Sequence, residues 1–221
     1  MNEIFEKIAT CIERGKVNET SPYPPDMKGQ PGAVELTKQA LDNGAKPQQI
    51  LTHGFMIGMR RIGDKFGNGQ AFIPDLMIAA KAMTASSELL KPYFSSGEIQ
   101  HKGSFIIGTV AGDLHDIGKN IVKMILEGAG WKVIDLGTDV TTEKYLQAIA
   151  QNPKAPVGMS ALLTTTMLNM EKSVKEIKSK HPDVRIIIGG APVTDDYRKK
   201  IGADAYFQSP HGLPAYLENL L

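Results

Sequence analysis

The segment Asp113-Leu-His-Asp116 carries the side chains best suited to chemistry in this sequence. It places one imidazole among carboxylates, and an imidazole that donates one ring N–H to a carboxylate is a common arrangement at metal ligands. An apolar run, Phe105–Val110, precedes the segment, and an amphipathic pattern begins after it at Ile117. The segment is therefore predicted to lie at the carboxyl end of a buried strand, where open α/β sheets bind ligands. The same residues also fit a simpler interpretation, in which Asp113 caps a helix and His115 is an idle surface residue.

Two other patches follow predicted strands further along the chain. One is Ser160-Ala-Leu162 with the hydroxyl-rich Leu163–Thr166 after it, and the other is Gly189–Pro192, which begins with a pair of glycines. The carboxyl ends of parallel strands meet at one edge of a sheet, so all three patches are expected to converge. Threonine hydroxyls can bond a buried polar group, and paired glycines let a flat or extended ligand approach the backbone closely.

Short β-branched runs alternate with amphipathic helices in the second half of the chain. Alternation at this spacing predicts right-handed crossovers and a parallel sheet of roughly five strands, in the flavodoxin-like (Rossmann-type) order 2-1-3-4-5. The fold class is therefore α/β. The strands are expected at 105–110, 132–135, 157–160, 185–188 and 205–207, and the helices near 117–128, 142–151, 167–180, 194–201 and 212–221.

Residues 1–95 contain only helical patterns, which predict a compact four-helix bundle. A linker is expected at 96–103, with Ser95–Gly97 as its hinge, and a second domain at 104–221. The helices of the bundle are expected near 2–14, 33–42, 46–66 and 74–90. The methionines at helical spacing are interpreted as bundle core rather than as a metal-facing stripe; they are Met56, Met59, Met77 and Met83.

The overall composition excludes several classes of protein. Lysine and arginine number 25 against 24 aspartates and glutamates, so no excess of positive charge indicates nucleic acid or an anionic membrane as a partner. No apolar segment has the length of a membrane span, and the first residues lack the core of a signal peptide. The lone cysteine, Cys11, excludes an internal disulfide framework and any cysteine-rich metal site. We therefore expect a cytoplasmic protein.

Three motifs together resemble the signature of base-off/His-on cobalamin-binding domains. They are Asp113-x-His115-x-x-Gly118, Ser160-x-Leu162 and Gly189-Gly190, separated by residues 119–159 and 163–188. The helices before them resemble the four-helix cap that precedes such domains in methyltransferases, so the resemblance covers nearly the whole chain. The most similar groups are the small corrinoid proteins of methanol, methylamine, betaine and aromatic O-demethylation systems, and the cobalamin-binding module of methionine synthase.

The resemblance implies a role for each matched position. His115 would be the lower axial ligand of cobalt, and Asp113 would accept the other imidazole N–H. Thr166 would complete this relay in place of the hydroxyl found in methionine synthase, so His115, Asp113 and Thr166 are the expected catalytic set. Phe72 resembles the aromatic residue of the cap that covers the methyl group. The residues expected around the cofactor are Asp113, His115, Asp116, Ile117, Gly118, Ser160, Leu162, Thr164, Thr166, Gly189, Gly190, Ala191, Tyr206 and Phe72.

The resemblance implies a methyl-carrier protein, which is the corrinoid subunit of a methyltransferase system and not a complete enzyme. Such a protein binds cobalamin or a related cobamide, accepts a methyl group on Co(I) from a substrate-specific methyltransferase, and passes it from methyl-Co(III) to a second methyltransferase. The acceptor would be a molecule such as tetrahydrofolate or coenzyme M, and a reductive activase is a further expected partner. One segment, Phe207–His211, departs from the small-residue ending of the family and leaves the pocket wall near Tyr206 undefined.

Other functions fit the residues less well. A dinucleotide site would need G-x-G-x-x-G, which Gly108, Gly112 and Gly118 do not form, and Asp113 would repel a pyrophosphate. A cobalamin-dependent sensor should carry a basic helix-turn-helix module, which residues 1–30 lack. An adenosylcobalamin mutase subunit would not need a methyl-shielding cap. The upper ligand separates the remaining alternatives, because methyl supports the carrier and adenosyl supports the sensor or the mutase subunit.

Overall fold

The computed structural model describes residues 2–221, which form two compact units. The first unit extends to His101 and includes Glu127–Gly130, and the second comprises Lys102–Leu126 and Trp131–Leu221. The first unit consists of helices and their connections, whereas the second alternates strands with helices. Within residues 2–221, no helix is both long enough and apolar enough to span a membrane.

The helices of the first unit pack around α1 (Asn2–Glu13), whose apolar residues recur on one buried face. Against α1 lie α2 (Ala33–Asp42), α4 (Met56–Gly67) and α5 (Ile73–Ser87). The helix predicted at 46–66 is continuous but composite, because α3 (Pro47–Gln49) leads through a π-helix, η2 (Ile50–Phe55), into α4. The remaining short helices are η1 (Pro25–Met27), η3 (Glu88–Leu90) and α6 (Lys91–Ser95).

The apolar side chains of α5 do not all enter the core of the first unit. Met56, Met59 and Met83 are buried as predicted, but Met77 is 54% exposed. Phe72, directly before α5, is 71% exposed. The prediction that Met77 belongs to the core is therefore wrong. Because α5 carries apolar residues on most of its circumference, helical spacing alone could not show which of them face the core.

The linker packs mostly within the first unit. Ile99 is 2% exposed, and the ring of His101 stacks on that of Phe94 with 4.6 Å between the centroids. The boundary between the two units follows His101. Residues 98–101, which follow the hinge expected at Ser95–Gly97, thus belong to the first unit.

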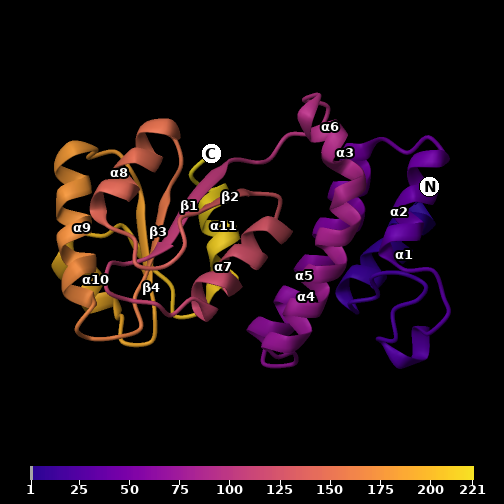
Figure 1. Ribbon diagram of the computed structural model, residues 1–221, viewed down its shortest axis with the longest axis horizontal. Helices are drawn as coiled ribbons and strands as arrows, with labels where there is room; N and C mark the ends of the chain where they lie inside the picture. Colours follow the sequence, from indigo (N-terminus) through magenta and orange to yellow (C-terminus); the bar gives the residue numbers. More distant parts are fainter. Residues whose placement is uncertain (1) are drawn as a thin grey trace. The chain divides into compact units, whose positions relative to one another are not determined.

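The second unit is built on a five-stranded parallel sheet in the order β2-β1-β3-β4-β5, which confirms the predicted topology. α7 (Ile117–Gly128) and α11 (Leu213–Glu218) cover one face, and α8 (Thr142–Gln151), α9 (Met167–Lys180) and α10 (Asp195–Ile201) cover the other (Figure 1). A short helix, η4 (Pro210–Gly212), precedes α11. The strands are β1 (Ser104–Thr109), β2 (Lys132–Asp135), β3 (Val157–Ser160), β4 (Ile186–Gly189) and β5 (Ala205–Tyr206).

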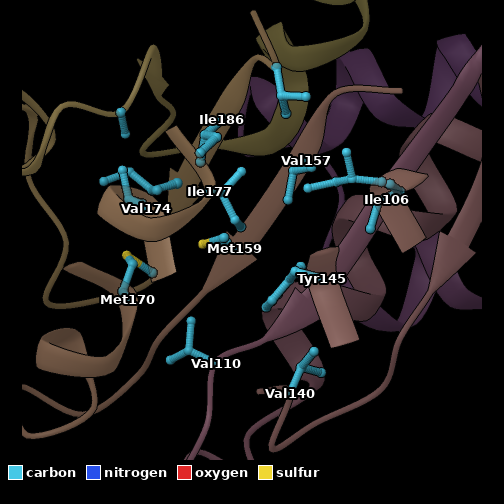
Figure 2. Packing of buried hydrophobic residues seen from close by; sticks show 14 of the residues in the cluster. Ile106, Val110, Val140, Tyr145, Val157, Met159, Met170, Val174, Ile177 and Ile186 are labelled. Atoms are coloured by element: carbon cyan, nitrogen blue, oxygen red, sulfur yellow. The ribbon is translucent and has the colours of Figure 1, made fainter. Parts of the chain in front are cut away.

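The face covered by α8, α9 and α10 holds a continuous hydrophobic core. Side chains alternate along a strand, so Ile106 of β1 and both Val157 and Met159 of β3 enter this core. Figure 2 shows them near Tyr145 of α8 and the apolar face of α9, which is formed by Met170, Val174 and Ile177. A slip of one residue would move these side chains out of the core to the opposite face, so the core fixes which residues of each strand point to that face.

Candidate functional site

A tight turn carries the chain from β1 to Asp113. The backbone N–H of Asp113 donates to the carbonyl oxygen of Val110 at 3.1 Å, and Gly112 between them has a φ of 80°. A positive φ at the third position is characteristic of a type II turn and favours glycine there. The turn brings Asp113 within hydrogen-bonding distance of the loop that follows β3.

The Asp113 carboxylate is fully buried and accepts hydrogen bonds at both oxygens. Its Oδ1 lies 3.1 Å from the backbone nitrogen of His115 and 2.8 Å from the Nδ1 of the same residue. Its Oδ2 accepts from the backbone N–H of Leu162 at 2.7 Å and lies 2.8 Å from the hydroxyl of Thr166. The Asp113 carboxylate therefore joins the first patch to the second, the segment after β3, and it brings together Asp113, His115 and Thr166, the expected catalytic set.

The Thr166 hydroxyl has two acceptors within reach and one proton to donate. Its Oγ1 lies 2.8 Å from Oδ2 of Asp113 and 2.8 Å from the carbonyl oxygen of Leu163. An ionised carboxylate is the stronger acceptor, so the proton points to Asp113. The result is a chain of hydrogen bonds that runs from Thr166 through Asp113 to the imidazole of His115.

The environment of Asp113 keeps its carboxyl group ionised. Burial by itself would raise the pKa of Asp113, but the N–H groups of Leu162 and His115 and the hydroxyl of Thr166 outweigh burial. Together they hold the pKa of this carboxyl well below its usual range. Because the ionised group can only accept, Nδ1 of His115 carries the proton and Nε2 keeps its lone pair.

His115 is fixed at the backbone and open at the side chain. The hydroxyl of Thr109 donates to its carbonyl oxygen at 2.9 Å, while its side chain is 52% exposed. The imidazole is thus oriented by Asp113 and presents Nε2 toward the surface. This arrangement supplies one metal-ligating nitrogen in a defined tautomer.

We expect Asp113→Asn to destabilise the cofactor-free protein by about 2–4 kcal/mol at neutral pH, since the asparagine amide would face N–H donors at a buried position. A carboxylate whose pKa falls on folding contributes stability that is fully present above the pKa of the unfolded state, which is about 4 for aspartate. This contribution is lost as the pH falls toward the pKa of the folded state. The difference from wild type should therefore narrow from about pH 4 downward. Urea unfolding at a series of pH values measures it, with exposed Asp183→Asn as the control. A difference that does not change with pH would contradict the role of the charge.

Small residues form a strip on the sheet face that α7 and α11 cover. Strand register places Thr109 beside Ser160 and Ser160 beside Gly189 in one row. A Cβ at Gly189 would meet only the carbonyl oxygen of Phe207, at 3.6 Å, and a Cβ at Gly118 would meet nothing within 4 Å. Gly118, Ser160 and Gly189, here called the small-residue strip, thus leave space beside His115 that larger residues would fill.

Exposed apolar side chains surround His115. Leu114 is 74% exposed, Ile117 66% and Leu162 42%. Water-exposed leucines are common one at a time, but a group of them beside an oriented imidazole indicates a surface that receives an apolar ligand. These three residues, here called the apolar rim, suit a broad ligand whose face lies over the ring of His115.

Comparison with known proteins identifies the family. A family model described as a B12 binding domain matches residues 103–214, and another with the same description matches residues 30–91. The chain is 39% identical over 193 residues to trimethylamine corrinoid protein 2 of Methanosarcina mazei, a match that covers 86% of this chain and 88% of that protein. The chain belongs to the family of B12-binding corrinoid proteins. Dimethylamine corrinoid protein 1 of Methanosarcina acetivorans is 38% identical, with 86% of this chain and 88% of that one covered.

Solved structures agree with membership in the corrinoid protein family. The structure of the methanol:cobalamin methyltransferase complex from Methanosarcina barkeri matches with a TM-score of 0.84 and 27% identity, over 99% of this chain and 79% of that chain. A cobalamin-binding protein from Desulfitobacterium hafniense matches with a TM-score of 0.73 and 26% identity, over 98% of both chains.

The residues of this corrinoid protein fit the cofactor of the family. A cobalt ion accepts imidazole nitrogen as a ligand, and Nε2 of the half-exposed His115 would be available to hold it. The apolar rim suits the broad face of the macrocycle. The small-residue strip leaves room for a slender substituent, because neither Gly118 nor Gly189 has a side-chain neighbour within 4 Å of a Cβ position.

Five further expected cofactor residues are exposed in the segments that follow β1, β3 and β4, including the first turn of α7: Asp116, Ile117, Gly118, Thr164 and Ala191. Asp116 is already engaged, since its carboxylate accepts from the Nδ2 of Asn120 at 2.9 Å. This side-chain contact links Asp116 to the first turn of α7. Phe72 belongs to the first unit, whereas the other expected residues belong to the second.

Tyr206 is placed on the other face of the sheet. Its side chain packs against the core that also contains Ile188, its neighbour in the register. The adjacent Phe207 instead makes an edge contact with Tyr216 of α11, 5.5 Å between centroids. We therefore expect Phe207, rather than Tyr206, to lie beside the small-residue strip. Alternation along β5 was the available signal, but a strand of two residues gives no phase by itself.

Proposed function

We propose that this corrinoid protein is a methyl carrier, the cofactor-bearing subunit of a methyltransferase system and not a complete enzyme. The chain of hydrogen bonds from Thr166 through Asp113 to His115 supports this best, because it leaves one nitrogen of an exposed imidazole available to a metal. When bound, the corrinoid supplies a cobalt ion that accepts a methyl group from one protein and donates it to another.

The second unit binds and orients the cofactor in this proposal. His115 would hold the cobalt ion through Nε2, and Asp113 with Thr166 would keep the imidazole in the tautomer that can ligate. The apolar rim would contact the macrocycle and exclude water from it. The small-residue strip receives the nucleotide tail, with the hydroxyls of Ser160 and Thr164 and the backbone at Gly190 and Ala191 as its polar neighbours.

The first unit shields the transferred group. Phe72, Ile73 and Met77 are exposed apolar side chains at the start of α5. Exposed apolar side chains of this kind can shield a methyl group from water, and Phe72 is the residue to which we assign this role. Two methyltransferases must reach the cofactor in turn, so we expect the first unit to move about the unit boundary after His101.

Methylated amines are the proposed source of the methyl group. The related proteins are named trimethylamine and dimethylamine corrinoid proteins, and the matches cover most of both chains. The partners are accordingly a substrate-specific amine methyltransferase, an acceptor methyltransferase and a reductive activase. We propose a cytoplasmic location, with which the single buried cysteine, Cys11, agrees.

The methyl donor is tested by reconstitution. The protein loaded with reduced cobalamin is mixed in turn with purified methyltransferases for trimethylamine, dimethylamine, monomethylamine and methanol, each with its substrate. We expect methylation of the cofactor, followed by its absorption spectrum, to be at least about tenfold faster with one amine enzyme than with the methanol enzyme. A preference for methanol would contradict the amine assignment. Retention of adenosyl rather than methyl as the upper ligand in the purified protein would instead support the sensor or the mutase subunit.

A further inference from the structure

One peptide in the turn before Asp113 is held at both of its polar atoms by side chains. The Nδ2 of Asn169 donates to the carbonyl oxygen of Ala111 at 2.7 Å, and the N–H of Gly112 donates to Oδ1 of Asp139 at 2.7 Å. The hydrogen bond of the turn itself joins its ends, from Asp113 to Val110, so this central peptide takes no part in it. Its contacts come from α9 and from the segment after β2.

Asp139 reaches the turn through an unusual backbone conformation. Among residues 2–221 it is the one non-glycine residue with a positive φ, 52°. Its own N–H donates to the carbonyl oxygen of Asp113 at 3.0 Å, and the next residue, Val140, resumes parallel pairing with Val110. Aspartate and asparagine are the side chains that best tolerate this conformation. Asp139 therefore contacts the turn with both its backbone and its side chain.

The central peptide is the part of such a turn that can rotate. Types I and II differ by a rotation of this peptide of about 150°, while the ends of the turn stay close together. Gly112 can adopt either form, so its own preference does not select type II. Asp113 follows at once, and its carboxylate must reach both His115 and Leu162. Contacts that hold the peptide in one orientation thereby also hold the carboxylate that orients the imidazole.

We infer that Asp139 and Asn169 are positioning residues for His115, because they lock the Ala111–Gly112 peptide and with it the Asp113 carboxylate. This inference rests on the proposed function, in which His115 ligates cobalt. Neither residue contacts His115 directly, and neither is part of the motifs seen in the sequence. Their effect is transmitted through the turn.

Variants at position 139 separate the hydrogen bond from the backbone conformation. Asp139→Asn keeps an acceptor and tolerates a positive φ, Asp139→Gly keeps only the conformation, and Asp139→Ala keeps neither. Asn169→Ala removes the opposite contact. The matched control is Glu35→Ala, which removes a carboxylate that accepts from the backbone N–H of Gly32, at 2.9 Å, in the first unit.

The principal measurement is the dissociation constant for cobinamide, a corrinoid with no nucleotide base, by absorbance titration. Because cobinamide has no base of its own, any axial nitrogen ligand must come from the protein. Nitrogen splitting in the electron paramagnetic resonance spectrum of the Co(II) form shows whether such a ligand is bound. Loss of one hydrogen bond should raise the dissociation constant about fivefold in Asp139→Gly, Asp139→Ala and Asn169→Ala. Asp139→Asn and the Glu35→Ala control should bind as wild type does. In the cofactor-free protein, hydrogen exchange at the Gly112 amide should be about fivefold faster in Asp139→Gly.

If Asp139→Gly and Asn169→Ala each bind cobinamide with wild-type affinity, the inference is overturned. It is also overturned if Glu35→Ala loses as much affinity for cobinamide as these two variants do. Wild-type protein that binds cobinamide without axial nitrogen would instead overturn the assignment of His115 in the proposed function. The two failures are therefore distinguishable.

Discussion

Replacement of His115 by alanine is expected to abolish axial nitrogen ligation while the corrinoid remains bound. The small-residue strip and the apolar rim do not involve the imidazole, so the cofactor contacts proposed for them should remain. The Co(II) form should lose its nitrogen splitting, and methyl transfer should slow by about 10- to 100-fold or more, since changes to residues that merely support a metal ligand already have effects of that size. Absorption and paramagnetic resonance spectra, with a transfer assay, measure the change.

Two controls make the His115→Ala result specific. His181→Ala removes another imidazole, at the end of α9, and should leave the spectrum and the rate unchanged. Added imidazole should restore nitrogen splitting in His115→Ala, because the space left by the side chain is open to solvent on the exposed side. An unchanged paramagnetic resonance spectrum and an unchanged rate of methyl transfer in His115→Ala would contradict the assignment of His115 as the axial ligand.

The topology was predictable because the chain alternates its two hydrophobic periods cleanly after residue 103. A buried strand such as Phe105–Val110 and an amphipathic helix such as 167–180 differ in period. The boundaries of the second unit therefore lie within about one residue of their predicted places, except that the last helix ends at Glu218 rather than at residue 221. Helices of the first unit were located equally well. The buried faces of these helices were harder to predict. α5 is apolar on most sides, so the exposure of Met77 depends on which neighbours surround it.

The site was predictable where its residues stand in local motifs and not where packing decides. Asp113 and His115 are neighbours in sequence, and their hydrogen bond follows from that proximity. The contact of Thr166 with Asp113 was anticipated by family resemblance rather than by chemistry. The side of the sheet on which Tyr206 lies and the left-handed conformation of Asp139 depend on strand register and on a loop closing against another element. Neither the position of Tyr206 nor the conformation of Asp139 follows from a pattern in the sequence.

Gly190→Ala is expected to cause the largest loss of stability in the second unit. Gly190 has a φ of 133°, and a Cβ there would lie 1.8 Å from the carbonyl oxygen of Ala161. The obstacle is backbone, so no side-chain rotation relieves it. Backbone strain and the clash together should cost at least about 3 kcal/mol and lower the melting temperature by roughly 10 °C or more. Thermal unfolding followed by circular dichroism measures this.

The control for Gly190→Ala is Gly202→Ala at the end of α10. Gly202 also has a positive φ, 81°, but a Cβ there would meet nothing within 4 Å. It should cost only about 1 kcal/mol, the strain of a left-handed residue without a clash. Equal losses in the two variants would show that conformation alone accounts for the effect at Gly190.

Gly190→Ala should also weaken corrinoid binding for a reason separate from stability. Ala161 precedes Leu162, whose N–H donates to Asp113, so a displaced Ala161 carbonyl shifts a donor that holds the carboxylate. The N–H of Ala161 also donates to the carbonyl oxygen of Gly189 at 3.2 Å, which couples the glycine pair to the same loop. At a temperature where the variant remains folded, its dissociation constant for cobinamide should therefore rise, whereas that of Gly202→Ala should not. The glycine pair would then act on His115 through the loop after β3, as well as by leaving space for a ligand.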